Sequence, residues 1–362
     1  MIYLDNAATT KMSKEVLAEM MPYLTDEYGN AGSIHEMGSN ARAAIDKARK
    51  RVAKAINAEP SEIIFTSGGS EANSLMVQSF CSYNLDGGRI LSSNTEHDSM
   101  RRSVLEWKYA CNISLVGVYG EKDVDLELYD LLSLMYVNNE LGFLNPVYEI
   151  GNSISSNYFV TDCVQALGNE VIDVRKMNCD ALSLSSHKIH GPKGVGALYV
   201  KESKRDMISP LIHGGDHQEF GRRGGTENVA GIVGFGKACE MINIDRNKMV
   251  ISKLRKMFLD GLNFKYRINY DRPDSKIISM TVPGVNAETL VIALSSVGVC
   301  ISAGSACRSL EEEPSRTLIA AGITPEEARS TVRISLSCYN TEDEMKEASK
   351  LFNKCVGALL ST

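Results

Sequence analysis

One lysine in this sequence stands where a side-chain amine can act as a covalent catalyst. Lys188 follows the apolar run at residues 181–184 and precedes a Gly-Pro turn at 191–192. An amine attacks a carbonyl efficiently only when it is partly desolvated and fixed in place, and a strand end with a proline-locked turn provides both conditions. The decapeptide 185–194 therefore predicts a Schiff-base lysine, although an ordinary loop lysine accounts for the same residues.

A second group of residues has the composition of a phosphate-binding turn. Residues 67–71, Ser-Gly-Gly-Ser-Glu, follow a predicted strand and open a predicted helix. Backbone N–H groups and hydroxyls at the positive end of a helix dipole hold phosphate, but a simple helix N-cap uses the same residue types. The chain has neither a Walker-type Gly-Lys-Ser nor a complete G-x-G-x-x-G, so a nucleoside triphosphate or a dinucleotide is not expected.

Further polar residues follow predicted strands, where the ligands of open parallel sheets collect. Asp162 follows an apolar run, at a place where a carboxylate can pair with a cationic ring nitrogen, and Gln165 lies one helical turn later. His97 follows another predicted strand, and His187 adjoins the lysine. A lone histidine is more often structural than catalytic. A phosphate cradle, a carboxylate, a histidine and a lysine together meet the needs of pyridoxal 5'-phosphate.

One cysteine near the end of the chain lies among small residues. Residues 302–309 read Ser-Ala-Gly-Ser-Ala-Cys-Arg-Ser, with Cys307 in the sixth place. Small residues bury little surface and allow the backbone to move, so this cysteine is predicted to be a mobile nucleophile, with Arg308 favouring its thiolate. An inert loop cysteine is the alternative. Cys300 lies in a more apolar stretch and is expected in the core.

Composition and charge exclude several classes of protein. The 362 residues are 43% hydrophobic and 23% charged, and the formal net charge is −6, which offers no basic surface for nucleic acid or for an anionic membrane. The N-terminus lacks the features of a signal peptide and no apolar run approaches membrane-spanning length, so a cytoplasmic protein is expected. Nine cysteines without a Cys-x-x-Cys pair indicate neither a disulfide framework nor a zinc site.

Short apolar runs alternate with longer amphipathic stretches, the pattern of a parallel sheet wrapped by helices. A first long helix is predicted at 40–56 and another from near Asn228. The predicted strands are 63–66, 89–92, 113–118, 134–137, 158–161, 181–185, 196–200, 277–282, 299–302 and 332–336. The expected fold class is α/β, with a large domain at 15–250 and a smaller α+β domain formed by 1–14 and 251–362.

The ordered combination of these motifs resembles the cysteine desulfurases of the NifS/IscS type, which depend on pyridoxal phosphate and belong to the fold-type I, class V aminotransferase superfamily. Each motif is weak alone, but their order along the chain is specific, and the resemblance covers essentially the whole sequence. The matching segments are 3–10, 29–30, 65–71, 96–97, 137–142, 162–165, 185–194, 223–228 and the stretch from 305–307 to Arg333.

The resemblance implies a role for each matching residue. Lys188 would form the Schiff base with the cofactor, His97 would stack on its ring and handle protons, and Asp162 would pair with its ring nitrogen. Gln165 and Asn139 would contact the cofactor oxygen and the substrate. The residues implied to hold the phosphate are Gly69, Ser70, Ser185, His187 and, reaching in from a second subunit, Thr226. The last of these implies a homodimer.

The resemblance also implies the reaction. Arg333 would grip the carboxylate of L-cysteine, Lys188 would remove the α-proton, and Cys307 would attack the substrate sulfur, leaving L-alanine and a persulfide. The persulfide would pass its sulfur to an acceptor such as an iron–sulfur scaffold or a tRNA-thiolation enzyme. No metal, nucleic acid or membrane is implied.

Other functions remain open from the sequence. A selenocysteine lyase or another class V aminotransferase would share the cofactor residues, although Cys307 argues against the aminotransferase. A non-catalytic scaffold for sulfur carriers is a different class, which the complete catalytic set disfavours.

The chain departs from the family pattern at four places. Phe220 stands where arginine is usual, which removes a positive charge near the expected site. Ser70 replaces a threonine and keeps the hydroxyl. The segment 119–133 is shorter than its counterpart, and Cys338 replaces a common glycine. Of these, Phe220 is the departure expected to affect rate or partner docking.

Overall fold

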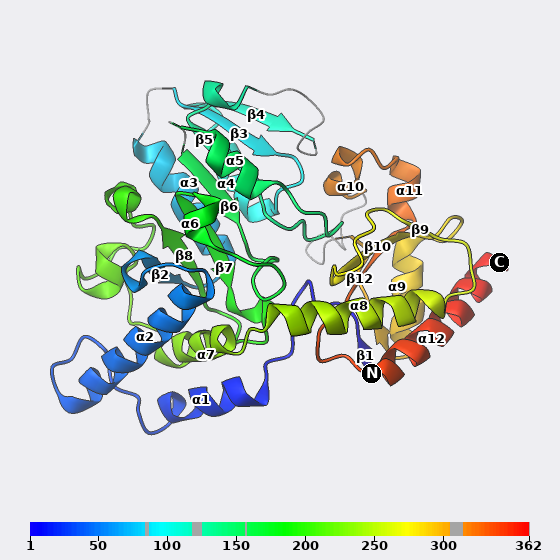
Figure 1. Cartoon of the computed structure of the whole chain (residues 1–362), viewed down its shortest axis with the longest axis horizontal. Coiled ribbons are helices and arrows are strands. Elements are labelled where there is room, and N and C mark those ends of the chain that lie inside the picture. Colours follow the sequence, from blue (N-terminus) through cyan, green and yellow to red (C-terminus); the bar gives the residue numbers. More distant parts are fainter. Residues whose placement is uncertain (84–86, 118–124, 156–157, 305–313, 362) are drawn as a thin grey trace. The chain divides into compact units, whose positions relative to one another are not determined.

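The computed structural model of the chain describes residues 1–83, 87–117, 125–155, 158–304 and 314–361 (Figure 1). These residues form two compact units. The large unit consists of Lys11–Tyr136 and Asn145–Ile242, and the small unit of Met1–Thr10, Val137–Leu144 and Asn243–Thr362.

The segment Val137–Leu144 lies in the small unit, whereas the predicted boundaries place it in the large domain. Its backbone packs closely against the rest of the small unit: a Cβ atom on Gly142 would lie 3.0 Å from the Cβ atom of Ile277. The ring of Phe143 contacts that of Tyr270 edge-on, at 5.9 Å between centroids. Contacts distant in sequence therefore assign this segment, and hydrophobic patterning does not reveal them.

The large unit is built on a seven-stranded sheet. Its strands, in spatial order, are β2 (Ile63–Thr66), β8 (Gly196–Val200), β7 (Ala181–Ser185), β6 (Tyr158–Asp162), β5 (Leu131–Ser133), β3 (Arg89–Ser93) and β4 (Asn112–Val116). Only β8 runs antiparallel to its neighbours among these strands. The other six strands therefore end at one common edge, and the predicted α/β class with a mainly parallel sheet flanked by helices is confirmed.

Helices cover both faces of this sheet. On one face, α3 (Gly69–Tyr83) and α4 (Asp98–Leu105) share a buried core with the strands, including Met76 and Val160. Phe159 points to the opposite face because side chains alternate along a strand, and there it meets α5 (Val147–Ser153). The remaining helices of the unit are α1 (Lys14–Leu24), α2 (Glu36–Ala55), α6 (Val174–Met177) and α7 (Val229–Glu240), with short 3₁₀ turns η1 (Pro60–Glu62), η2 (Leu126–Leu128), η3 (Ser186–Lys188), η4 (Glu202–Met207) and η5 (Gln218–Gly221).

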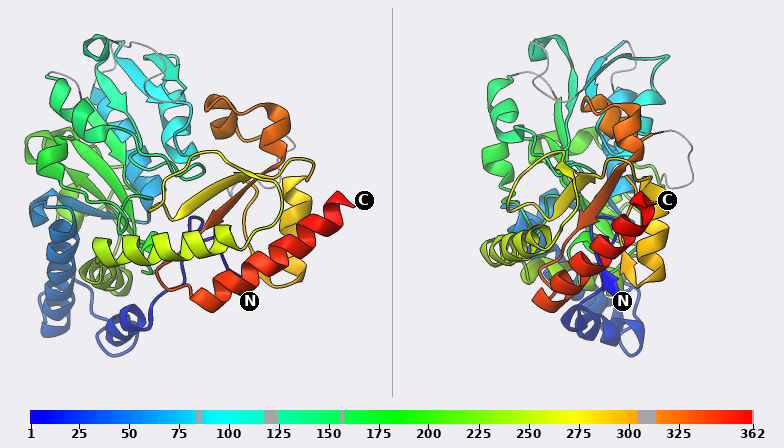
Figure 2. Two further views of the ribbon diagram at one scale, coloured as in Figure 1. Left: turned by 45° about the vertical axis from the view of Figure 1, so that its right-hand side comes forward. Right: turned by 90° about the vertical axis from the view of Figure 1, so that its right-hand side faces the viewer.

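The small unit contains a three-stranded antiparallel sheet in the order β12 (Thr331–Ser335), β10 (Ile277–Thr281) and β9 (Arg267–Ile268). A parallel pair joins β1 (Ile2–Tyr3) to β11 (Val299–Cys300). Figure 2 shows α8 (Ile244–Asp260) and α12 (Glu342–Leu360) side by side, and the rings of Phe258 and Phe352 meet edge-on between them, with centroids 5.1 Å apart. The other helices are α9 (Ala287–Ser296), α10 (Arg316–Ala320) and α11 (Pro325–Arg329).

Three predicted strands, 63–66, 181–185 and 196–200, are confirmed with the same bounds, and most others agree within two residues. The strand predicted at 134–137 is wrong, because β5 lies at Leu131–Ser133. Beyond Ser133 the backbone still bonds to β6 through the N–H groups of Leu134 and Tyr136, but side chains bind the backbone of Met135 between them. The Met135 N–H donates to Glu96 at 2.6 Å, and the Met135 carbonyl accepts from the Asn145 amide at 2.7 Å.

The predicted helix 40–56 begins four residues earlier, at Glu36, because His35 caps it by accepting from the Gly38 N–H. The helix predicted from near Asn228 is confirmed as α7, which Asn228 caps. Among the described residues, no helix is both long and apolar enough to cross a membrane.

Two helical glycines differ sharply in their surroundings, which gives a matched test of the packing. A Cβ atom on Gly236 of α7 would lie 2.7 Å from the Cβ atom of Ala48 on α2, whereas a Cβ atom on Gly357 of α12 would meet nothing within 4 Å. Gly236→Ala is expected to cost roughly 1–3 kcal/mol through overpacking. Gly357→Ala is expected to gain up to about 1 kcal/mol from helix propensity.

Thermal unfolding midpoints of the two variants and of the parent chain check this expectation. The midpoint should fall for Gly236→Ala and should stay or rise for Gly357→Ala. Equal shifts in both variants would show that the close contact between α2 and α7 does not limit stability.

Candidate active site

The predicted catalytic lysine follows the buried strand β7 in a tightly bonded turn. Lys188 ends η3, and the N–H groups of Ile189 and Gly191 both donate to the carbonyl oxygen of Ser186 at 3.1 Å. Gly191 has no room for a side chain, since a Cβ atom there would lie 2.0 Å from the Ser186 hydroxyl. The backbone of Lys188 is therefore fixed at the carboxyl end of a strand, as predicted.

A residue with left-handed backbone closes this turn. His190 has a φ angle of 65°, which is costly for a residue with a side chain. Two contacts with the segment before α1 hold it: the His190 ring Nδ1 lies 2.9 Å from the Lys11 carbonyl oxygen, and the Ser13 N–H donates to the His190 carbonyl at 3.0 Å. The lysine turn is thus anchored from outside as well as from within.

The predicted phosphate cradle brings together residues from two distant segments. Gly69 begins α3, and a Cβ atom on it would lie 2.5 Å from the Cγ2 atom of Val164 and 3.8 Å from the Cβ atom of Ser185. The Ser185 hydroxyl is buried and has no hydrogen-bond partner among the described residues. Burying an unpaired hydroxyl costs free energy, so this atom is suited to an external acceptor such as a phosphate oxygen at the α3 N-terminus. Ser70 is exposed at the same helix end.

An ion pair ties the cradle to the loop that carries Thr226. The Glu71 carboxylate accepts from the Ser67 N–H at 2.7 Å and from Arg223 Nε at 3.0 Å. Burial raises the pKa of the Glu71 carboxyl, but the hydrogen bonds from Arg223 and Ser67 outweigh it and leave this pKa below its ordinary value. Thr226 is exposed on this loop, and its reach into a second subunit stays a prediction.

The predicted ring-nitrogen partner ends β6. Asp162 is 4% exposed, and its carboxylate accepts from the Val164 N–H at 2.9 Å and from the Asn73 amide at 2.8 Å. A buried charge needs such partners, and the carboxylate retains lone pairs for a cationic ring nitrogen. Gln165 is buried three residues further on.

His97 lies at the N-cap of α4, where its ring Nδ1 accepts from the Ser99 N–H at 3.2 Å and lies 2.8 Å from the Ser99 hydroxyl. The Asn73 amide also donates to that hydroxyl, at 2.9 Å. Asn73 therefore connects Asp162 with His97, a role that the sequence analysis missed. The available signal was a polar residue on the apolar, buried stripe of α3.

A second group of predicted residues lies within the small unit. Arg333 is 3% exposed, and its guanidinium donates to the Asp5 carboxylate at 2.8 Å and to the Asn139 carbonyl oxygen at 2.9 Å. Its Nε atom is buried and has no partner among the described residues. The arrangement orients a guanidinium that keeps donors for a carboxylate. Asp5 belongs to a recognised motif, but its contact with Arg333 was not predicted.

The predicted nucleophile, Cys307, lies outside the described residues. Burial raises the pKa of the thiols of Cys163, Cys179 and Cys239. A thiol with a raised pKa forms little thiolate at neutral pH and is a poor nucleophile. The burial of these three thiols therefore argues against any of them as the nucleophile.

Phe220, which stands where the resemblance leads us to expect an arginine, is 43% exposed. The guanidinium carbon of Arg49 lies 5.0 Å from the centre of its ring, and that of Arg205 lies 5.6 Å from it. An aromatic face attracts such cations. The Phe220 ring therefore contacts two guanidinium groups, those of Arg49 and Arg205.

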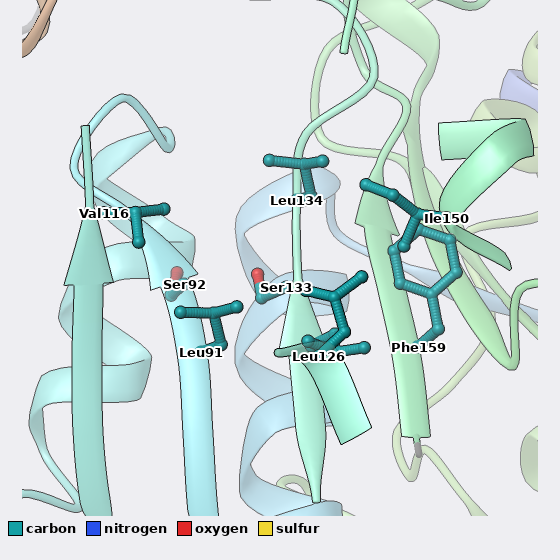
Figure 3. Close-up of a pocket in the computed structure, with 9 residues that line it drawn as sticks. Leu91, Ser92, Val116, Leu126, Ser133, Leu134, Ile150 and Phe159 are labelled. Carbon is teal, nitrogen blue, oxygen red and sulfur yellow. The ribbon is translucent and has the colours of Figure 1, made fainter. Parts of the chain in front are cut away.

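A separate small cavity, about 20 Å³ in volume, lies between strands and α5 of the large unit (Figure 3). Its lining is mostly apolar, with the hydroxyls of Ser92 and Ser133 buried and without hydrogen-bond partners among the described residues. None of the predicted site residues lines it. A cavity with few polar groups and no titratable side chain is not suited to the chemistry considered above.

Comparisons with known proteins cover both units. Residues 2–347 match the family described as aminotransferase class-V. The cysteine desulfurase IscS of Methanosarcina thermophila is 39% identical, over 99% of this chain and 92% of that protein. A solved NifS-like protein has a TM-score of 0.89 at 32% identity and covers 99% of both chains. A structure of SspA in complex with cysteine has a TM-score of 0.81 at 32% identity, over 94% of this chain and 100% of that chain.

The unpaired hydroxyl of Ser185 gives a test of the predicted cofactor site that does not depend on catalysis. Ser185→Ala is expected to lower the affinity for pyridoxal phosphate roughly tenfold or more, because a hydrogen bond to a charged group contributes about 1.5–3 kcal/mol. Titration of the cofactor-free protein with pyridoxal phosphate, followed by absorbance, measures the effect.

Ser133→Ala is the matched control, since it removes another buried, unpaired hydroxyl of the large unit, one that lines the cavity of Figure 3, where none of the predicted site residues lies. It should leave the affinity unchanged. Equal affinities of Ser185→Ala and the parent chain would exclude Ser185 as a phosphate ligand.

Proposed function

Because this chain belongs to the aminotransferase class-V family, we propose that it is a pyridoxal-phosphate-dependent cysteine desulfurase, which releases sulfur from L-cysteine and leaves L-alanine. The observation that carries the proposal is the convergence of a fixed lysine, a phosphate cradle and a buried carboxylate at one edge of the large unit's sheet. Relatives that bear this name extend over nearly the whole chain, and one structural neighbour was solved with cysteine.

The residues of the large unit fit this cofactor. Gly69, Ser70, Ser185 and His187 would hold its phosphate, and Asp162 would pair with its ring nitrogen. When bound, pyridoxal phosphate supplies an electron sink for charge that develops on the substrate's α-carbon. Lys188 would provide the amine that binds the cofactor and would take the α-proton at Nζ.

The small unit would contribute substrate binding and the nucleophile. Arg333, oriented by Asp5 and by the Asn139 carbonyl, would hold the substrate carboxylate. The thiolate of Cys307 would form an S–S bond with the substrate sulfur as the Cβ–S bond breaks. The bonding pair would stay with the carbon fragment, which gains a proton and leaves as alanine.

We propose a homodimer for the working enzyme, supported by the exposed position of Thr226. A cytoplasmic location and transfer of the persulfide sulfur to an acceptor protein, such as an iron–sulfur scaffold or a tRNA-thiolation enzyme, complete the proposal.

The nucleophile is tested by Cys307→Ala. The parent chain, loaded with cofactor and given a reductant, should release alanine and sulfide from L-cysteine in equal amounts. The rate of the variant should be at least a hundredfold lower, while its binding of pyridoxal phosphate should be normal, because only the sulfur acceptor is removed. Alanine and sulfide assays of the two proteins make the comparison.

Cys300→Ala is the control for loss of a neighbouring small-unit cysteine and should keep most of the activity. Full turnover by Cys307→Ala would contradict the assignment of Cys307. Release of selenide from selenocysteine, without sulfide from cysteine, would instead indicate a selenocysteine lyase.

Arg333→Lys tests the carboxylate site. Lysine cannot make the paired, planar contacts of a guanidinium, so kcat/KM for L-cysteine is expected to fall about 10–100-fold, chiefly through a higher KM. Steady-state kinetics over a range of cysteine concentrations measure the change.

Arg255→Lys is a closely matched control. Arg255 is also buried in the small unit and also donates to one backbone carbonyl, of Ile277, and to one carboxylate, of Asp271. Arg255→Lys should lower the stability of the fold about as much as Arg333→Lys does, but should change the KM for L-cysteine little. An equal rise of KM in both variants would show that Arg333 acts through stability alone.

A further inference from the structure

We infer that Asn73 and Ser99 are positioning residues that hold the His97 imidazole in one tautomer, with its proton on Nε2. The inference begins from a continuous chain of hydrogen bonds in the large unit. It runs from the Asp162 carboxylate through the Asn73 amide and the Ser99 hydroxyl to Nδ1 of His97, with successive separations of 2.8, 2.9 and 2.8 Å.

The charge on Asp162 sets the direction of the first bond. An ionised carboxylate only accepts hydrogen bonds, so the NH₂ group of Asn73 must face it. The opposite orientation of the amide would place the carbonyl oxygen of Asn73 against the carboxylate. Asn73 is 1% exposed, and both protons of its NH₂ group are used, one on Asp162 and one on the Ser99 hydroxyl.

The orientation of the Asn73 amide in turn fixes which hydrogen bonds His97 can make. Because the Ser99 hydroxyl accepts from Asn73, its single proton is available for Nδ1 of His97. The Ser99 backbone N–H points at the same nitrogen, at 3.2 Å. A ring nitrogen that receives two donors carries no proton itself, so the neutral imidazole of His97 has its proton on Nε2.

The helix adds to this preference. His97 is the N-cap of α4, and the first turn of a helix carries a partial positive charge. This charge favours a lone pair on Nδ1. A proton on Nδ1 would be repelled by the partial positive charge of the helix end and by the Ser99 N–H.

The tautomer determines what His97 can do in the reaction, which here rests on the proposed function. Nε2 presents a hydrogen-bond donor and not a base, because accepting a proton there would require the existing proton to move to Nδ1. His97 is therefore a neutral donor that stabilises negative charge on the substrate or cofactor, a use of histidine known in other enzymes. The proton-accepting atom in the large unit is then Nζ of Lys188.

The tautomer is measurable on the full-length chain without cofactor or substrate. Protein labelled with ¹⁵N-histidine gives multiple-bond ¹H–¹⁵N spectra that distinguish the two neutral tautomers and the imidazolium ion. The chain has six histidines, and His97→Gln identifies the signals of His97. The expected spectrum at neutral pH is a single Nε2–H tautomer, and an Nδ1–H form or an imidazolium ion would overturn the inference.

Removing the side chain of either positioning residue should allow the His97 ring to exchange between its two neutral tautomers. Ser99→Ala and Asn73→Ala are expected to give averaged ¹⁵N shifts that show a population of the Nδ1–H form, whereas Ser99→Thr, which keeps the hydroxyl, should restore the single tautomer. Unchanged spectra in both alanine variants would overturn the positioning role.

The chain supplies matched controls on the same two helices. The hydroxyls of Ser74 on α3 and Ser103 on α4 lie 3.0 Å apart, next to the chain described above but outside it. Ser74→Ala and Ser103→Ala should leave the His97 spectrum unchanged. A loss of the single tautomer in these variants as well would indicate a general loosening of α3 against α4 and would count against the specific role.

Kinetics with L-cysteine give a second readout. Ser99→Ala is expected to lower kcat about tenfold with KM nearly unchanged, since binding of the substrate carboxylate does not involve this residue. If the chain releases no alanine but shows the assigned tautomer, the proposed function fails and the positioning role stands. If it releases alanine but shows the Nδ1–H tautomer, the proposed function stands and the positioning role of Asn73 and Ser99 fails.

Discussion

The negative charge of Asp162 is the constraint on which the large unit's site depends. A carboxylate that is 4% exposed must be surrounded by donors, and here they come from the Val164 N–H and from Asn73. That requirement places an amide on the apolar stripe of α3, directs a serine hydroxyl on α4, and thereby orients a histidine. It also leaves the carboxylate ready for a cationic partner, so one buried charge organises both the protein and the ligand that it would bind.

The antiparallel strand β8 is the second element that makes the site possible. Because it runs against both β2 and β7, these two strands end at the same edge of the sheet. The cradle after β2 and the lysine turn after β7 are thereby neighbours although more than a hundred residues separate them. Glycine allows their approach, since a Cβ atom on Gly196 of β8 would lie 2.7 Å from the Cα atom of Gly68 and 2.5 Å from the Leu184 carbonyl oxygen.

The sequence was sufficient for features that depend on local patterning. Strands β7 and β8 are buried along their whole length and appear as short, mostly apolar runs, so their bounds were predicted correctly. The end of β5 was missed because two side chains, of Glu96 from 39 residues earlier and of Asn145 from ten residues later, bind the Met135 backbone in place of a strand. Asn73 and Asp5 were missed as site residues for the same physical reason: their importance lies in a partner that only the folded chain brings within 3 Å.

The Phe220 position shows how a departure from a family pattern can be accommodated. Glu219 and Phe220 both have left-handed backbone, with φ angles of 43° and 59°, a conformation that costs free energy in residues other than glycine. Three hydrogen bonds offset this cost, because the Glu219 carboxylate accepts from both terminal nitrogens of Arg49, at 2.8 and 2.6 Å, and from the Phe65 N–H at 2.7 Å. The same guanidinium packs on the Phe65 and Phe220 rings. The loop toward Thr226 thus starts from a buried ion pair, which holds its geometry with phenylalanine at position 220.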